Sequence, residues 1–124
     1  MEYEYWLAKV QGVPARKKCL LREYMKSAKD VYYYIEETHL KTLAFLNEKE
    51  RDALIQAKRQ PLPEEEYETM LRKGIRFVPW CSSEYPKRLK EITDFPYALY
   101  VKGSLPHEER RRTAIVGARR CTPY

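Results

Sequence analysis

A change in the spacing of apolar residues near residue 60 constrains the fold of this chain more than any other feature. Before it, apolar residues recur at the i, i+3, i+4 and i+7 spacing of a helix, as at Tyr3, Trp6, Leu7 and Val10. After it, short β-branched and aromatic runs alternate with one or two helical stretches. The sequence therefore predicts a helical domain over 1–60, a linker and connecting helix over 61–72, and an α/β part over 73–124.

Short helices with clear capping signals account for the first 60 residues. Ser27–Asp30 resembles a capping box with Asp in place of Glu, and Asn47–Glu50 starts a helix that reaches about Arg59. Between them, we expect the helix after Ser27 to turn Val31, Tyr34 and Ile35 inward. About five helices with short connections predict a compact bundle that unfolds cooperatively on its own.

The second part shows a helix followed by three candidate strands. A helix with acidic residues at its start runs from residue 64 and stops at Gly74. Residues 75–80, 97–102 and 113–116 are predicted strands of one mainly parallel sheet, with a helix over 83–92 between the first two. The fold class is therefore α followed by the start of α/β.

Positive charge is concentrated at the end of the chain. The chain carries 24 Lys and Arg against 18 Asp and Glu, a net charge of +6. Basic and acidic residues cancel over 61–102, whereas 103–124 holds five arginines and two glutamates. Such a stretch favours nucleic acid or another anionic partner.

Several classes of protein are disfavoured by composition. The three cysteines are odd in number and form no CxxC pair, and neither histidine lies near them, so we expect no disulfide framework and no metal site. The start of the chain lacks the basic and apolar stretches of a signal peptide, and no apolar run is long enough for a membrane span. We therefore expect a cytoplasmic protein with no membrane contact.

The last ten residues have the pattern of a phosphate-binding corner. The apolar run Ile115–Val116 leads to Gly117, and Thr122–Pro123 is a typical helix start. Loop N–H groups, a helix amino terminus and the Arg119 and Arg120 side chains could face an anion there. A solvated terminus with an ordinary glycine turn is the alternative reading of the same residues.

The chain stops where this last helix would begin, so we expect it to be an amino-terminal fragment. The strands and helices that would cover Ile115 and Val116 are missing from this sequence. We therefore expect these two side chains to stay exposed or to be covered by a neighbouring copy. The last dozen residues are expected to lack order of their own.

Four motifs carry a resemblance to a known family. They are Lys73-Gly74-Ile75-Arg76-Phe77 through Trp80, Tyr85-Pro86-Lys87-Arg88-Leu89, Pro96-Tyr97-Ala98-Leu99-Tyr100-Val101-Lys102-Gly103, and Thr113-Ala114-Ile115-Val116-Gly117-Ala118-Arg119-Arg120-Cys121-Thr122-Pro123-Tyr124. In this order and spacing they resemble the DNA-processing protein DprA (Smf) family. The resemblance is specific from about residue 73 and loose before residue 60.

The resemblance implies both a fold and a function. The fold would be a SAM-like or helix-hairpin-helix-like domain followed by an extended Rossmann-like domain, here truncated. The family binds single-stranded DNA, protects incoming DNA and delivers it to the RecA recombinase during natural transformation. The implied protein is not an enzyme, needs no cofactor, and self-associates at full length.

Site residues follow by position from the family motif. Gly117, Ala118 and Arg119 match its G-[S/A]-R segment, whose arginine contacts DNA phosphate, and Arg120 and Thr122 have a supporting role. A second DNA contact is considered at Arg16, Lys17 and Lys18, next to a hairpin where the family usually reads PGIG. Here that hairpin reads Gln11-Gly12-Val13-Pro14, and Pro14 has no N–H to offer. A solvated helix face is the alternative for these three residues.

Two other functions stay open at this stage. A nucleotide-processing enzyme of the lysine-decarboxylase-like phosphoribohydrolase group would need a later catalytic glutamate and a glycine-rich phosphate motif, neither of which is in this sequence. The helical part could instead be a protein-interaction module. Tyr32-Tyr33-Tyr34 suggests base stacking, but consecutive helical residues point in different directions, so core packing and partial burial are expected.

Overall fold

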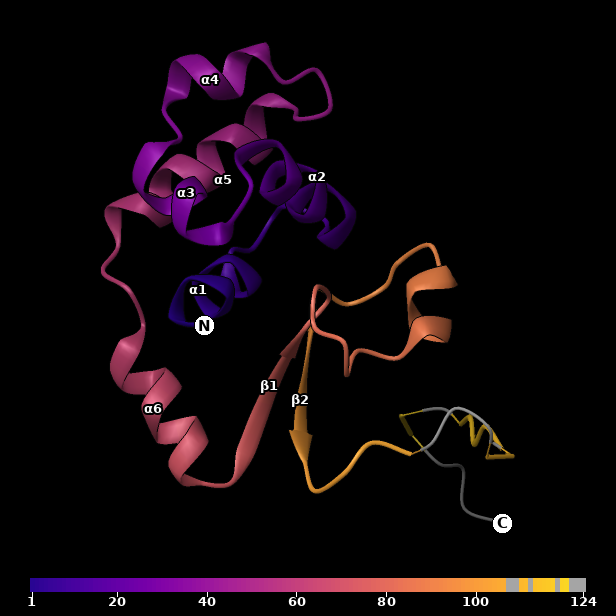
Figure 1. The fold of residues 1–124 in the computed structure, drawn as a ribbon. Helices are drawn as coiled ribbons and strands as arrows, with labels where there is room; N and C mark the ends of the chain where they lie inside the picture. The colour runs from indigo at the N-terminus through magenta and orange to yellow at the C-terminus, as the bar shows by residue number, and fades with distance from the viewer. Residues whose placement is uncertain (107–109, 112, 118, 121–124) are drawn as a thin grey trace.

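The computed structural model describes residues 1–106, 110, 111, 113–117, 119 and 120, and this part of the chain is mostly helical (Figure 1). Its elements are α1 (Glu2–Lys9), α2 (Ala15–Met25), α3 (Ala28–Tyr34), α4 (Glu37–Thr42), α5 (Glu48–Arg59), α6 (Glu64–Arg72), β1 (Ile75–Pro79), the 3₁₀ helix η1 (Lys87–Glu91) and β2 (Ala98–Lys102). The five helices predicted before residue 60 are confirmed, as is the helix that follows the linker.

The predicted capping residues begin two of these helices. Ser27 Oγ accepts a hydrogen bond from the Asp30 backbone N–H at 3.1 Å and donates one to the Asp30 carboxylate at 2.9 Å. Asn47 and Glu50 form a reciprocal capping box at the start of α5. Asp30 bonds the serine hydroxyl, whereas the longer Glu50 side chain reaches the backbone N–H of its N-cap at 2.9 Å.

In the described part of the chain, the helical core takes one buried side chain from beyond residue 60. Leu7, Leu21, Ile35, Leu40 and Leu54 are its largest fully buried side chains. Tyr97, which directly precedes β2, belongs to the same cluster. Its hydroxyl donates to the Glu4 carboxylate at 2.6 Å. A cooperative unit limited to residues 1–60 stays a prediction.

The two strands pair antiparallel, so the prediction of a mainly parallel sheet is wrong. Ile75 pairs with Lys102, and Pro79 pairs with Ala98. The intervening chain returns to the end of β1 that it left, where the Trp80 N–H donates to the Tyr97 carbonyl at 2.7 Å. A parallel pair would need a crossover to the opposite end of the sheet.

Residues 113–116 are not a strand in the described structure, which corrects the third strand prediction. Ile115 and Val116 are 96% and 92% exposed. An apolar run forms a buried strand only when a neighbouring strand and a covering layer are present. The described residues supply neither for this run, and the expected exposure of both side chains is confirmed.

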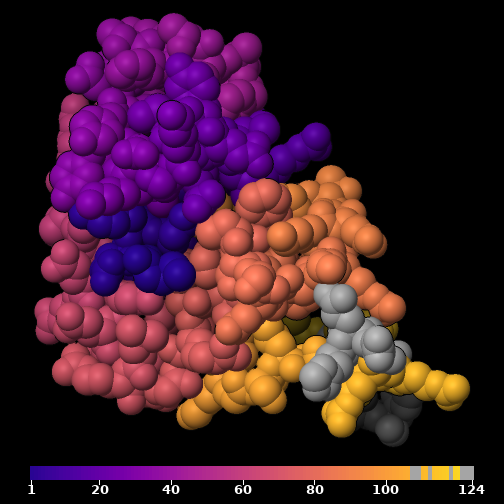
Figure 2. Space-filling model, in the orientation of Figure 1, coloured from indigo at the N-terminus to yellow at the C-terminus, as the bar shows by residue number. Residues whose placement is uncertain are grey.

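Helix α1 lies between the helical group and the sheet. One face of the sheet packs Phe77 against Tyr5 of α1 and against Tyr67 and Met70 of α6. The other face packs Val78 and Val101 under Tyr85, Leu89 and Leu105. Figure 2 shows the indigo surface of α1 bordered by violet helices on one side and by the rose and salmon surface of later residues on the other.

Smaller corrections concern element types and faces. The helix predicted over 83–92 is the short 3₁₀ helix η1. Of the three residues predicted to face inward here, Val31 and Ile35 are buried, whereas Tyr34 at the end of α3 is 65% exposed. The stop at Gly74 is confirmed, since its φ of 75° is the left-handed conformation expected after a helix.

Candidate nucleic-acid interface

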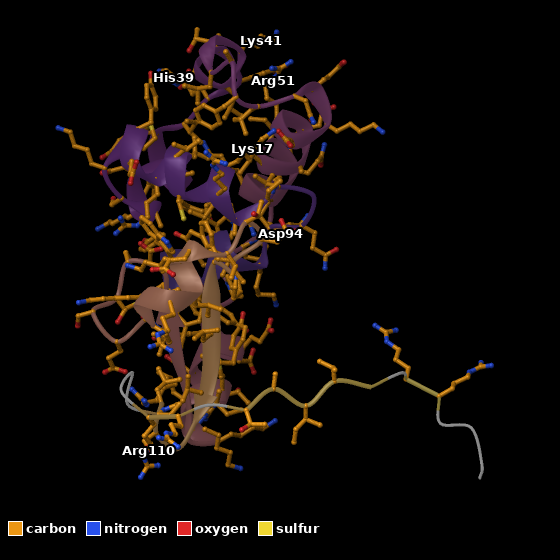
Figure 3. The ribbon with its side chains drawn as sticks, turned by 90° about the vertical axis from the view of Figure 1, so that its right-hand side faces the viewer. Lys17, His39, Lys41, Arg51, Asp94 and Arg110 are labelled. Atoms are coloured by element: carbon orange, nitrogen blue, oxygen red, sulfur yellow. The ribbon has the colours of Figure 1, made fainter. Side chains whose placement is uncertain are left out.

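The predicted site lies on a segment that follows β2 and is exposed throughout its described residues. We call Arg110, Arg111, Thr113–Gly117, Arg119 and Arg120 the arginine segment. All of its described residues are exposed, and Figure 3 shows Arg110 near the foot of the hairpin, with the segment leading away from it. Its arginines form no ion pair with any described acidic side chain. These guanidinium groups are therefore accessible to an anionic ligand.

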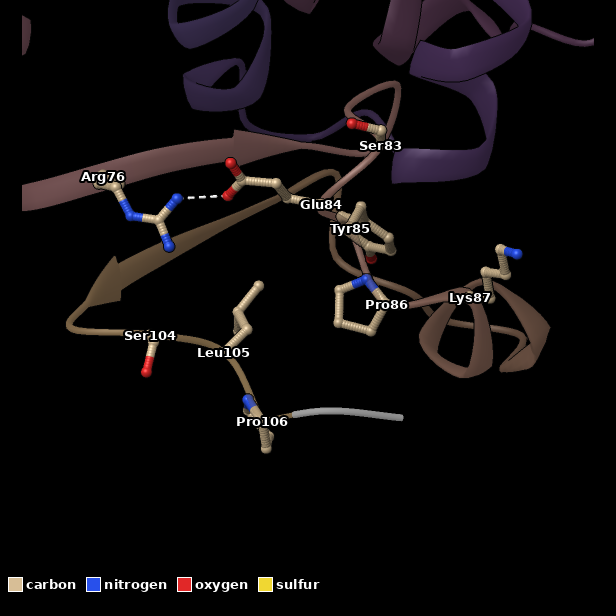
Figure 4. Close-up of a pocket in the computed structure, with 9 residues that line it drawn as sticks. All are labelled: Arg76, Ser83, Glu84, Tyr85, Pro86, Lys87, Ser104, Leu105 and Pro106. Atoms are coloured by element: carbon tan, nitrogen blue, oxygen red, sulfur yellow. Dashed lines mark hydrogen bonds and ion pairs between the residues drawn. The ribbon is translucent and has the colours of Figure 1, made fainter. Parts of the chain in front are cut away.

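Arg76 of β1 contacts the chain where it leaves β2. Its guanidinium pairs with the Glu84 carboxylate and donates to the Gly103 carbonyl at 3.4 Å (Figure 4). Gly103 has a φ of 91°, a left-handed conformation that side chains disfavour. The contact between Arg76 and Gly103 is not predictable from the sequence, because it spans 27 residues and depends on the strand register.

A cavity of about 510 Å³ opens between the hairpin, the 83–87 segment and the chain after β2 (Figure 4). It is lined by Arg76, Ser83, Glu84, Tyr85, Pro86, Lys87, Ser104, Leu105 and Pro106. The guanidinium of Arg76 is already held by a carboxylate, and the Tyr85 hydroxyl donates to the Pro96 carbonyl at 2.6 Å. Two of the polar groups in this cavity are thus occupied by the protein itself, and we assign it no ligand.

Nothing in the described part of the chain requires a glycine at position 117. A Cβ atom built at this position meets nothing within 4 Å, and the φ of Gly117 is outside the left-handed region. A glycine in such a place leaves the backbone open to close approach by a ligand. Of the other predicted site residues, Ala118 and Thr122 lie outside the described residues.

Gly117→Ala is expected to leave stability unchanged and to weaken DNA binding. The added methyl group has free space around it, so the free energy of unfolding should change by less than about 0.5 kcal/mol. The same methyl group would hold a phosphate away from the backbone N–H groups, and we expect a loss of affinity of about fivefold. Thermal unfolding and oligonucleotide titration of the same preparations test both parts. Unchanged affinity would remove Gly117 from the interface.

The three residues of the second predicted contact, Arg16, Lys17 and Lys18, have different surroundings in the structure. Arg16 is exposed. Lys18 is only 5% exposed, and its Nζ donates to the Ala8 carbonyl at 2.9 Å. Because consecutive helical residues point in different directions, the three side chains cannot share one face. Lys18 lies in the core and is not placed to touch DNA.

Lys17 is engaged by a carboxylate of another helix. Its Nζ donates to both Glu50 carboxylate oxygens at 2.9 Å. Burial acts to raise the pKa of Glu50, but the bonds from Lys17 and from the Asn47 N–H outweigh it and lower that pKa. Glu50 thus caps α5 and ties it to α2, which leaves Arg16 as the accessible cation of the three.

Lys18→Met is expected to remove a pH dependence of stability. Burial lowers the pKa of Lys18 from 10.5 to about 8. Between these values the unfolded chain keeps a proton that the folded chain has released, so wild-type protein gains stability relative to the variant as pH rises, by roughly 1–3 kcal/mol in total. Urea unfolding of both proteins at about pH 7, 8.5 and 10 measures this difference. A difference that does not change with pH would contradict the assignment.

The last part of the chain resembles a known protein family. Residues 76–124 match the family described as DNA recombination-mediator protein A. This part of the chain is similar to that family. The match begins at Arg76 and includes the arginine segment, so it confirms the resemblance noted in the sequence. No curated protein and no solved structure matches the chain.

The match to the DNA recombination-mediator protein A family supports a role in DNA processing and recombination. Within the described residues, no helix is long and apolar enough to cross a membrane. The same residues bring no three His, Cys, Asp or Glu side chains together in an arrangement that could hold a metal ion.

Proposed function

We propose that this chain binds single-stranded DNA as part of a cytoplasmic recombination mediator. The mediator would protect incoming DNA and deliver it to the RecA recombinase during natural transformation. The family match supports a role in recombination. The observation that carries the proposal is that the four arginines described inside the matched segment are exposed, namely Arg110, Arg111, Arg119 and Arg120.

The proposed chemistry is recognition of the phosphate backbone without reading of sequence. Arg119 and Arg120 would each bind a phosphate through bidentate hydrogen bonds from the planar guanidinium group. Gly117 would let the strand approach the backbone, and Ala118 and Thr122 would complete the loop. Positively charged segments that follow the phosphates bind single strands with little sequence preference.

The remaining parts of the proposal concern fold and partners. We propose a SAM-like helical domain over 1–60 and an extended Rossmann-like domain that begins at about residue 73. Self-association and the transfer to RecA would belong to the full-length protein. The proposed role needs neither catalysis nor a cofactor, because the protein holds and hands over a strand without changing its bonds.

A titration at several salt concentrations tests the proposal. A fluorescent oligonucleotide of deoxythymidines and a nucleotide monophosphate are offered to the protein at about 50 to 200 mM salt. Binding should favour the oligonucleotide and weaken with salt, with a logarithmic slope of about −0.7 for each phosphate contacted. Equal affinity for the monophosphate, or binding that salt does not affect, would contradict recognition of a DNA backbone.

A further inference from the structure

Four tyrosines form one continuous aromatic surface on the helical part. We call Tyr3 of α1 and Tyr32, Tyr33 and Tyr34 of α3 the tyrosine face. The Tyr3 ring lies 5.6 Å from both Tyr32 and Tyr33, measured between centroids, and Tyr33 lies 6.3 Å from Tyr34. The Tyr3 and Tyr33 hydroxyls are hydrogen-bonded at 2.8 Å. Tyr32 and Tyr33 also contact each other directly, with ring centroids 5.2 Å apart, and Tyr3 of α1 extends the group by packing against both.

Two rings of the tyrosine face are exposed, whereas the ring beneath them packs against the core. Tyr33 and Tyr34 are 54% and 65% exposed. Beneath them, Tyr32 packs edge-on against the buried Trp6, with ring centroids 5.1 Å apart. Val31 and Ile35 at either side of the three tyrosines are fully buried. An exposed group of rings held in place in this way loses little freedom on binding a flat ligand.

The charge around the tyrosine face is mixed. The Lys29 ammonium lies 5.9 Å from the centroid of the Tyr3 ring. The hydrogen bond with Tyr33 raises the pKa of Tyr3 to about 12, so the Tyr3 hydroxyl is neutral at physiological pH. The Glu64 carboxylate also acts on Tyr3. A ligand here would therefore be held by its flat faces more than by its charge.

We propose that the tyrosine face is a second contact for single-stranded DNA, on which one or two bases stack. Exposed, fixed rings with a lysine beside them suit nucleobases, since every base offers a π-face and stacking tolerates any sequence. The inference rests on the proposed function, because it assigns the tyrosine face to the same strand that the arginine segment holds. The two contacts differ in chemistry, because the arginine segment would bind phosphates and the tyrosine face would bind bases.

The test compares base-containing and abasic oligonucleotides on the full chain. Tyr33→Leu combined with Tyr34→Leu should reduce affinity for the normal oligonucleotide by roughly tenfold. The slope of affinity against salt should stay unchanged, because no phosphate contact is lost. Affinity for the abasic oligonucleotide, which keeps its phosphates, should equal that of wild-type protein.

Two further variants control this test. Tyr33→Phe combined with Tyr34→Phe keeps the rings and should bind like wild-type protein, which separates stacking from the hydroxyl pair. Tyr100→Leu removes an equally exposed tyrosine of β2, 55% exposed, and should leave binding unchanged. Circular dichroism confirms that each variant is folded before it is titrated.

The outcomes separate this inference from the proposed function. If the leucine variant binds the normal oligonucleotide like wild-type protein, the tyrosine face is not a DNA contact, and a protein partner becomes its expected occupant. If it loses affinity equally for normal and abasic oligonucleotides, base stacking is excluded. In either case, weaker binding by an arginine-segment variant would still support the proposed function.

Discussion

Tyr97→Ala is expected to lower the free energy of unfolding by about 3 to 5 kcal/mol, the usual range for truncation of a large buried aromatic ring. Tyr97 is 5% exposed and packs in the core of the helical part, although it lies directly before β2. Its hydroxyl donates to Glu4, which also accepts a bond from Arg22 Nε at 2.5 Å. Tyr97 is thus one of the side chains that join the helices to the sheet.

Urea unfolding followed by circular dichroism measures this loss. Tyr100→Ala is the matched control, because Tyr100 lies three residues later and is 55% exposed; we expect it to cost less than about 1.5 kcal/mol. Tyr97→Phe should cost about 1 to 2 kcal/mol, since only the hydrogen bond to Glu4 is lost. A loss below about 1 kcal/mol for Tyr97→Ala would mean that the helices do not depend on this side chain.

Replacement of both Arg119 and Arg120 by alanine is expected to weaken binding of a single-stranded oligonucleotide by about tenfold or more at low salt. Each arginine that contacts a phosphate contributes to affinity and to its salt dependence. The logarithmic salt slope should therefore become shallower, by about 0.7 for each contact removed. Stability should be unchanged, because both side chains are exposed.

Arg59→Ala is the control for this pair. Arg59 is an exposed arginine in the last turn of α5, remote in sequence from the arginine segment. Arg59→Ala removes one positive charge where the double variant removes two, and it should change affinity by less than about twofold. If Arg59→Ala weakens binding as much as the double variant does, the loss of affinity comes from the lower net charge of the protein and not from the arginine segment.

Much of the fold could be predicted because it depends on local chemistry. Ser27, Asn47 and Gly74 begin or end helices through bonds and backbone angles within a few residues of themselves. The direction of strand pairing could not be predicted in this way, since it depends on how the chain returns between Pro79 and Ala98. The run at 113–116 was assigned from its apolar residues alone, and a strand also needs a partner.

The candidate site shows the same division between local and distant effects. The arginine segment stands out in the sequence because its charge and its glycine are neighbours. The burial of Lys18 could not be foreseen, since it depends on the Ala8 carbonyl and on the Tyr97 ring, from two other parts of the chain. The tyrosine face also needed the structure, because Tyr3 joins Tyr33 across 30 residues.

Photochemical cross-linking tests most directly whether the arginine segment binds DNA. Single-stranded oligonucleotide containing bromodeoxyuridine is bound to the protein at low salt and irradiated, and the attached peptides are identified by mass spectrometry. We expect cross-links within residues 113–122, and expect high salt to abolish them together with binding. Cross-links that form only elsewhere, with none in 113–122, would contradict the assignment of this segment as the DNA-binding site.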